Sequence, residues 1–210
     1  VSAIMQNLFR VKNARSKKVI QNILASFFIK GWSGVMQLLL VPLTLACLSN
    51  YEYGVWMTIS TMLVWIESMD IGLGNGMRNM LATYRAEGYD EKAKQVVSTC
   101  FYSLALFMLF VGIILYVIEH YINFYAFLNV DANVVNNLSL VIQLSTIIVC
   151  ATFVFKFIGN VYLALQLPAI NNLLLVFGNT LSFVGIFVAK MLFDEVSLIA
   201  IAIISTLGPL

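Results

Sequence analysis

Long apolar segments recur along almost the whole chain, and they limit its possible folds more than any other feature. A helix that crosses a bilayer needs about 20 mostly apolar residues. Five segments of the 210-residue chain reach this length, and a sixth begins before the end. Their approximate ranges are 19–48, 54–76, 96–118, 134–157 and 170–193, with the sixth starting near 196. The runs lack the alternation of barrel strands, so we predict α-helices, which satisfy their own backbone hydrogen bonds in lipid.

The composition supports this assignment. The chain is 61% hydrophobic and 10% charged, whereas soluble domains carry about 25% charged residues. We therefore predict an all-α integral membrane protein, a polytopic helical bundle. Residues 1–18 form a basic cytoplasmic tail, and residues 19–210 form a transmembrane region of about six helices. The chain begins with Val1 and stops within an apolar run, so we interpret it as a fragment of a longer protein, truncated in its last helix.

The basic residues are distributed unequally between the two sides of the predicted bundle. Ten of the twelve fall on one side: Arg10, Lys12, Arg15, Lys17 and Lys18 in the tail, Arg78, Arg85, Lys92 and Lys94 after the second span, and Lys156 at the edge of the turn after the fourth. The loops after the first and third spans contain neither lysine nor arginine. Lysine and arginine on short loops mark the cytoplasmic side, so we predict a cytoplasmic N-terminus. Topology explains the basic tail without a nucleic-acid partner, and contact with anionic lipid is compatible with it.

Three ionisable residues lie deep within the predicted spans, where such groups are costly and mark functional sites. Lys30 is in the first span, and Glu67 and Asp70 are in the second. At 1.5 Å per residue, all three lie at about the same depth. Glu67 and Asp70 share one helix face, as do Lys30, Gly34 and Gln37. Two interpretations stay open: Lys30 pairs with one acid and holds two helices together, or the three residues line a water-filled cavity in which one acid binds a cation or a proton.

The segment "DIGLGNGMRN", residues 70–79, is rich in glycine but is not a nucleotide-binding loop. Its spacing is GxGxG, and a long apolar run precedes it instead of a strand. We predict that it forms the cytoplasmic end of the second span, followed by a short amphipathic helix in "YRAEGYDEKAKQ" with a break at Gly88. Its glycines permit close packing or local unwinding toward a polar ligand. Arg78 is suited to a phosphate, whether of a ligand or of lipid headgroups.

Motifs for catalysis or metal binding are missing from the sequence. There is no Ser/His/Asp set and no zinc-ligand spacing, and Cys47, Cys100 and Cys150 lie in or beside apolar runs without a CxxC pattern. We interpret the cysteines as apolar fillers and His120 as part of an aromatic interfacial belt. We expect no enzyme, no metal and no cofactor other than a coupling H+ or Na+. The residues alone favour a transporter over a receptor or scaffold.

Residues from about 50 to 175 resemble a known family. The segments that carry the resemblance are "EYGVW", "DIGLGNGMRN", "EKAKQVVST" and "ALQLPAINNLL". Together they are similar to the bacterial polysaccharide flippases, the Wzx-type branch of the MOP superfamily. The resemblance implies a MATE-like transporter of two lobes in the bacterial inner membrane, with this chain as the N-terminal six-helix lobe. It also implies that undecaprenyl-pyrophosphate-linked oligosaccharide repeat units, as in O-antigen, capsule or lipopolysaccharide biosynthesis, move from the cytoplasmic to the periplasmic leaflet by alternating access.

The resemblance also suggests roles for particular residues. Four polar residues would contact the pyrophosphate–sugar headgroup: Lys30, Gln37, Asn75 and Arg78. Glu67 and Asp70 would hold Lys30 in place or bind the coupling H+ or Na+. Only one lysine lies deep in the predicted spans, so a strongly cationic cavity would need residues from outside this chain. Implied partners besides the lipid-linked oligosaccharide are membrane lipids, a glycan polymerase and a chain-length regulator.

Two other function classes stay open. A MATE-type cation-coupled multidrug exporter shares the superfamily and the fold, and an acidic cavity without a dominant lysine would favour it. The other class is a membrane anchor within a glycan polymerase complex, which leaves the intramembrane charges without a task.

Overall fold

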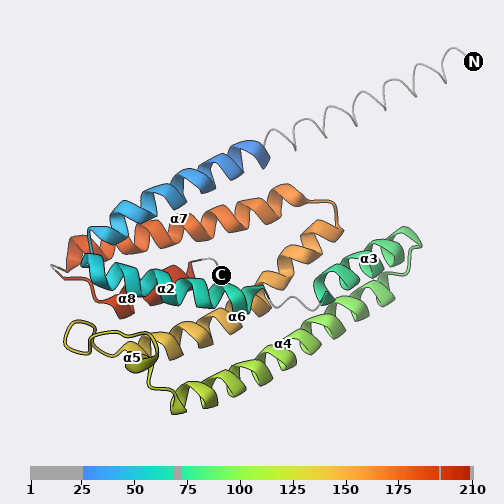
Figure 1. Ribbon diagram of the computed structural model, residues 1–210. Coiled ribbons are helices and arrows are strands. Elements are labelled where there is room, and N and C mark those ends of the chain that lie inside the picture. Colours follow the sequence, from blue (N-terminus) through green and yellow to red (C-terminus); the bar gives the residue numbers. More distant parts are fainter. Residues whose placement is uncertain (1–25, 69–71, 194, 209–210) are drawn as a thin grey trace, which may run out of the picture.

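A computed structural model of the chain describes residues 26–68, 72–193 and 195–208. The predicted basic tail, residues 1–18, lies outside them. All regular elements in these ranges are helices (Figure 1), as the sequence predicts. In chain order they are Ser26–Leu45, which we call the first helix, α2 (Asn50–Glu67), α3 (Leu73–Ala86), α4 (Asp90–Tyr121), α5 (Phe124–Phe127), α6 (Leu138–Ala164), α7 (Pro168–Leu192) and α8 (Leu198–Leu207).

Four of the described helices are long and apolar enough to cross a membrane. They are the first helix, α4, α6 and α7, and α8 is a shorter apolar helix. The chain is therefore a multi-pass helical membrane protein. The finer expectations, six spans in one lobe of a two-lobe transporter with a cytoplasmic N-terminus, stay predictions.

Helix α6 forms the centre of the bundle. It contacts α2, α3, α4, α7 and α8, while the first helix runs beside α7 and α4 flanks the bundle on the other side (Figure 1). The most apolar window of α6 is 44% buried, compared with 11% for the first helix and for α4 and 17% for α7. Because lipid is as apolar as the side chains, close packing rather than exclusion from water holds such helices together. The exposed faces of the outer helices are thus normal for a membrane bundle.

Two clusters of buried apolar side chains meet on α6. The larger joins α2, α6 and α8 and includes Ile59, Val141 and Ile201. The smaller joins α3, α4 and α6 and includes Met77 and Met108. The buried face of α3 lies in this second cluster, which therefore holds α3 against α4 and α6.

The predicted continuous second span, residues 54–76, is wrong. Helix α2 ends at Glu67, and α3 begins at Leu73 after Gly72, whose φ is +80°. This left-handed conformation is accessible to glycine at little cost, so "DIGLGNGMRN" contains a break and the first two turns of a new helix. The predicted break at Gly88 is confirmed: its φ is +77°, and it separates α3 from α4.

Candidate functional site

A cavity of about 270 Å³ lies between four helices. Three of its wall residues, Val41, Met57 and Val64, are exposed, so the cavity is open to the surface on one side. We call it the interior cavity. The first helix, α2, α6 and α8 line it with Leu40, Val41, Thr44, Tyr53, Trp56, Met57, Ser60, Leu63, Val64, Val149, Ser205 and Thr206. Most of the wall is apolar, and hydroxyl groups interrupt it on three of the four helices.

The hydroxyl groups of the interior cavity are tied to their own helices. Thr44, Ser60 and Thr206 each donate to the backbone carbonyl four residues earlier, at 2.7, 2.8 and 2.6 Å. This local bonding is common for serine and threonine within helices. The proton of each hydroxyl is used, and the oxygen lone pairs remain as acceptors. The cavity can therefore accept hydrogen bonds from a ligand that carries hydroxyl groups.

Gln37 and Lys30, two predicted site residues, lie on the same face of the first helix as Thr44 of the cavity wall. Gln37 and Lys30 precede Thr44 by seven and fourteen residues, and a straight helix drifts only about 20° per seven residues. Both side chains are exposed. At 1.5 Å per residue, Lys30 lies about 21 Å along the helix from Thr44.

The acids predicted to pair with Lys30 cannot be placed beside it. Asp70 lies outside the described residues, and only the backbone of Glu67, at the end of α2, is described. The pairing of Lys30 with either acid, and the binding of a coupling ion by them, stay predictions.

Lys156 lies within a span, and the sequence analysis placed it wrongly. We predicted it at the edge of a turn, but α6 continues to Ala164, about two turns beyond it. Its side chain is half-buried. The expectation that only Lys30 lies deep in the spans is wrong for the same reason. The polar Asn160 interrupts the apolar run and suggested an early end to the helix.

The neighbours of Lys156 show which way it faces. Gly159 approaches the side chain of Asn171 on α7 closely, and a Cβ added to Gly74 of α3 would lie 2.5 Å from Nδ2 of Asn160. Residues three and four apart share one side of a helix. Lys156 therefore faces the interior, between α3 and α7.

Lys30 and Lys156 are displaced from the interior cavity toward the same end of the bundle. Lys156 follows Val149, a residue of the cavity wall, by seven residues on α6. The first helix and α6 run in opposite directions (Figure 1). Lys30 precedes the cavity residues of the first helix, and Lys156 follows that of α6. Lys30 and Lys156 thus lie on the same helix faces as residues of the cavity wall. Both are displaced from the cavity toward the end of the bundle where α6 turns into α7.

The structure brings Asn75 and Arg78 together, but away from the interior cavity. They lie one turn apart on α3, and a guanidinium nitrogen of Arg78 donates to Oδ1 of Asn75 at 3.3 Å. Arg78 is half-buried, and neither residue lines the interior cavity. The side chains predicted to contact the headgroup therefore form two separate pairs, Lys30 with Gln37 and Asn75 with Arg78.

Glu119 is a candidate that the sequence analysis missed. We assigned it to the outer loop, because the apolar run ends at Ile118, but α4 continues through Tyr121. The half-buried carboxylate accepts a 2.7 Å hydrogen bond from the hydroxyl of Thr146 on α6. Its other oxygen, Oε2, is buried and has no hydrogen-bond partner within the described part of the chain. Had the predicted third span been extended by one turn beyond Ile118, it would have included Glu119 in the helix that packs against α6.

The three cysteines are free thiols; Cys150 is buried, and Cys47 and Cys100 are half-buried. In the loop after the first helix, burial raises the pKa of the Cys47 thiol, and the charge of Lys190 opposes this weakly. Cys47 therefore stays protonated and unreactive at neutral pH. Within residues 26–68, 72–193 and 195–208, no group of three or more His, Cys, Asp or Glu side chains could hold a metal ion.

No family model matches the chain, and no curated protein or solved structure matches it either. The resemblance of residues 50–175 to the polysaccharide flippases stays a prediction.

Proposed function

We propose that the chain forms part of a transporter that flips undecaprenyl-pyrophosphate-linked oligosaccharide repeat units across the bacterial inner membrane by alternating access. The observation that supports this most strongly is Lys156, a second lysine within the candidate spans, which is half-buried in the central helix α6. A pyrophosphate group carries negative charge, and a lysine ammonium binds phosphate as a point charge. Lys30 and Lys156 would attract this headgroup toward the interior cavity.

The polar groups nearby suit the sugar part of the same substrate. The cavity hydroxyls of Thr44, Ser60 and Thr206 keep acceptor capacity after bonding to their own helices. Sugar hydroxyls can donate to such oxygens. A membrane anchor without transport would gain nothing from these groups, because polar and charged side chains inside a membrane are costly.

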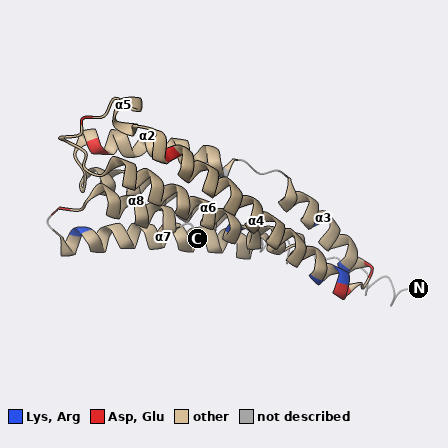
Figure 2. Cartoon of the chain, turned by 90° about the horizontal axis from the view of Figure 1, so that it is seen from below, with Lys and Arg blue, Asp and Glu red and all other residues tan. Residues whose placement is uncertain are grey.

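The distribution of charge supports the orientation in the membrane that this proposal requires. Basic side chains gather with acidic ones at the end where α3 meets α4 (Figure 2), and they include Arg85, Lys92 and Lys94. This connection carries lysine and arginine, whereas the segments after the first helix and after α4 carry neither, which favours a cytoplasmic location for it. Lys30 and Lys156 would then lie on the cytoplasmic side of the interior cavity, where the lipid-linked oligosaccharide is taken up. H+ or Na+ would drive the cycle.

The test is made in cells depleted of the full-length protein. Their lipids are extracted, and undecaprenyl-linked oligosaccharide on the cytoplasmic leaflet is quantified. We expect this lipid to accumulate on depletion and to disappear when the gene is restored. Absence of accumulation would contradict the proposed function.

Two lysine variants then test the role of the intramembrane cations in the same cells. The double variant Lys30→Gln/Lys156→Gln should insert normally but fail to remove the accumulated lipid. Lys92→Gln is the matched control, because Lys92 lies over the ring of Tyr89, 4.5 Å from its centroid, on α4 near the membrane surface. It should restore export fully. Full export by the double variant would exclude the two lysines as substrate contacts.

A cation-coupled multidrug exporter is the second candidate, and Glu119 favours it. A half-buried carboxylate with one unpartnered oxygen could bind the coupling ion or a cationic drug. For an exporter, Glu119→Gln or Asp70→Asn should remove resistance to cationic dyes and leave glycan export unchanged. For the flippase, dye resistance should not depend on the protein.

A further inference from the structure

A second hollow runs along the surface between α4 and α6. It consists of two successive stretches of about 740 and 710 Å³. We call it the α4–α6 groove. Lys94, Ser98 and Tyr102 lie on α4 in the first stretch, and Leu109, Gly112 and Tyr116 continue the α4 wall in the second.

The two stretches form one continuous groove. On α4 the wall residues follow one another at intervals of three or four, which places them on a single helix face. On α6 the wall runs from Leu165 through Ile158 and Phe155 to Ile147 in the same manner. From Lys94 to Tyr116 the groove is about 33 Å long at 1.5 Å per residue. This length is close to the thickness of the hydrocarbon core, about 30 Å.

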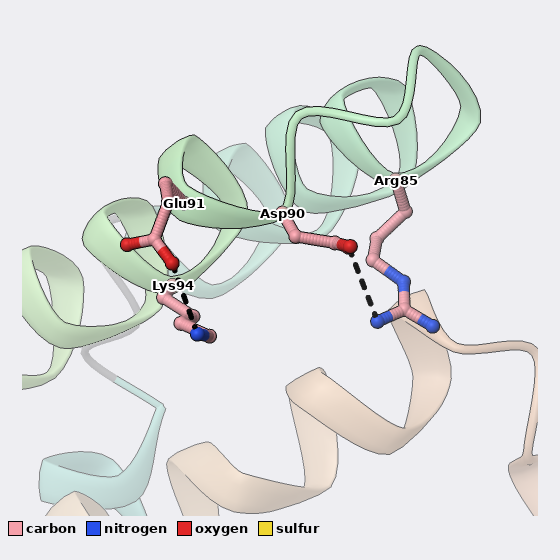
Figure 3. Close-up of polar contacts among 4 residues, drawn as sticks. All are labelled: Arg85, Asp90, Glu91 and Lys94. Carbon is pink, nitrogen blue, oxygen red and sulfur yellow. Dashed lines mark hydrogen bonds and ion pairs between the residues drawn. The ribbon is translucent and has the colours of Figure 1, made fainter.

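The charged side chains gather at one end only. Arg85 of α3 lies 3.7 Å from a carboxylate oxygen of Asp90, and Lys94 lies 3.1 Å from Glu91 (Figure 3). Both cations are well exposed, at 58% and 75% of the side chain. Exposed ion pairs contribute little stability, so a phosphate group can replace either carboxylate. The second stretch, beyond Tyr102, is lined by apolar side chains and Tyr116.

We propose that the α4–α6 groove binds an anionic phospholipid of the membrane, with its phosphate at Arg85 and Lys94 and an acyl chain along the apolar stretch. Arg85 and Lys94 at the mouth can bind an anionic headgroup in exchange for their exposed carboxylate partners, and the length and apolarity of the remainder match lipid chains. Gly112 and Cys150 face each other across the second stretch, since a Cβ added to Gly112 would be in van der Waals contact with the Cys150 sulfur at 3.7 Å.

This site is distinct from the interior cavity. Val149 lines the interior cavity, whereas Ile147 and Ala151 line the groove. Two residues along a helix are rotated by about 200° from each other. The groove and the cavity therefore lie on opposite sides of α6, and a bound phospholipid need not be the transported substrate.

The test uses the purified full-length protein in nanodiscs, with native mass spectrometry of lipids that remain bound. Phosphatidylglycerol is compared with phosphatidylcholine of the same acyl chains, and glycerol phosphate serves as a headgroup without chains. We expect retention of phosphatidylglycerol over phosphatidylcholine and no retention of glycerol phosphate. Equal retention of the two phospholipids, or retention of glycerol phosphate, would overturn the proposal.

Three variants locate the bound lipid. Arg85→Gln/Lys94→Gln should weaken phosphatidylglycerol binding by about 25-fold, at about fivefold for each cation. Gly112→Leu should abolish binding by filling the apolar stretch while the charges stay. Lys92→Gln, which removes one charge outside the groove, should change binding less than about twofold. Unchanged binding in the first two variants, or an equal loss in the third, would contradict a site in this groove. None of these outcomes depends on whether the protein exports glycan.

Discussion

The two hollows on either side of α6 differ in where their polar atoms lie. The interior cavity has hydroxyl groups distributed over three of its helices, and two lysines lie beyond it toward one end of the bundle. The α4–α6 groove has its cations at the mouth and is almost wholly apolar beyond. A distributed set of acceptors suits a ligand that is polar throughout, and a charged mouth with an apolar channel suits an amphipathic one. One central helix thus separates two surfaces with different chemistry, and changes on one side should leave the other unaffected.

Closing the interior cavity should have the largest effect. Ser60→Leu would place an apolar side chain in the cavity wall and remove an acceptor. We expect glycan export to fall to the level of depleted cells, while phosphatidylglycerol binding is unchanged. Ser98→Leu is the matched control, because Ser98 also bonds to its own helix but lines the groove. If Ser98→Leu stops export as completely as Ser60→Leu does, the two sides of α6 are not independent.

Wedging α3 away from α6 should have the next largest effect. Gly74→Val would press against Asn160, one turn from Lys156. Overpacking of this kind costs about 1–3 kcal/mol, and we expect a lower unfolding temperature of the detergent-solubilised protein. Gly76→Val is the control, since an added Cβ at Gly76 meets nothing within 4 Å. Asn160→Ala should partly rescue Gly74→Val, and a lack of rescue would show that the contact is not between these two residues.

A change at the break between α2 and α3 should be smaller. Gly72→Ala places a Cβ on a residue at φ +80°, which costs about 1–2 kcal/mol. Gly72→Asn should cost less, because asparagine visits the left-handed region more readily. Thermal unfolding of both variants measures the difference. Equal stability of Gly72→Ala and the parent protein would show that α2 and α3 can join in a continuous helix.

The smallest effect is expected at the mouth of the groove. Glu91→Gln removes the exposed ion pair with Lys94 and should change stability by less than about 1 kcal/mol. It should also strengthen phosphatidylglycerol binding, because a competing carboxylate is lost. Weaker binding in this variant would show that Glu91 orients Lys94 instead of competing for it.

Sequence reasoning predicted what depends on apolar length and missed what depends on contacts between helices. The helical class follows from runs that are too long and too apolar for a soluble fold. The break at Gly72 could not be predicted from these runs, because glycine fits a membrane helix as well as a turn. At Gly72, the packing of α3 on α4 and α6 decides between a continuous helix and a turn.

The candidate site was predicted in part for the same reason. Lys30 and Gln37 follow from their spacing on one helix. Lys156 and Glu119 were missed because each lies near a place where the apolar run stops but the helix does not. Asn160 packs closely against Gly74, and Thr146 hydrogen-bonds to Glu119, so polar side chains at these positions contact other helices instead of marking helix ends.

The two glycines with positive φ have a mechanical consequence. Gly72 and Gly88 bound α3 at both ends, so no continuous helix transmits the tilt of α2 or α4 to it. Contacts with α4 and α6 set the angle of α3. A change in those contacts would tilt α3 as a rigid helix, with the backbone rotating at Gly72 and Gly88. Because Asn160 and Lys156 lie one turn apart on α6, such a tilt would alter the space around Lys156 without bending any long helix.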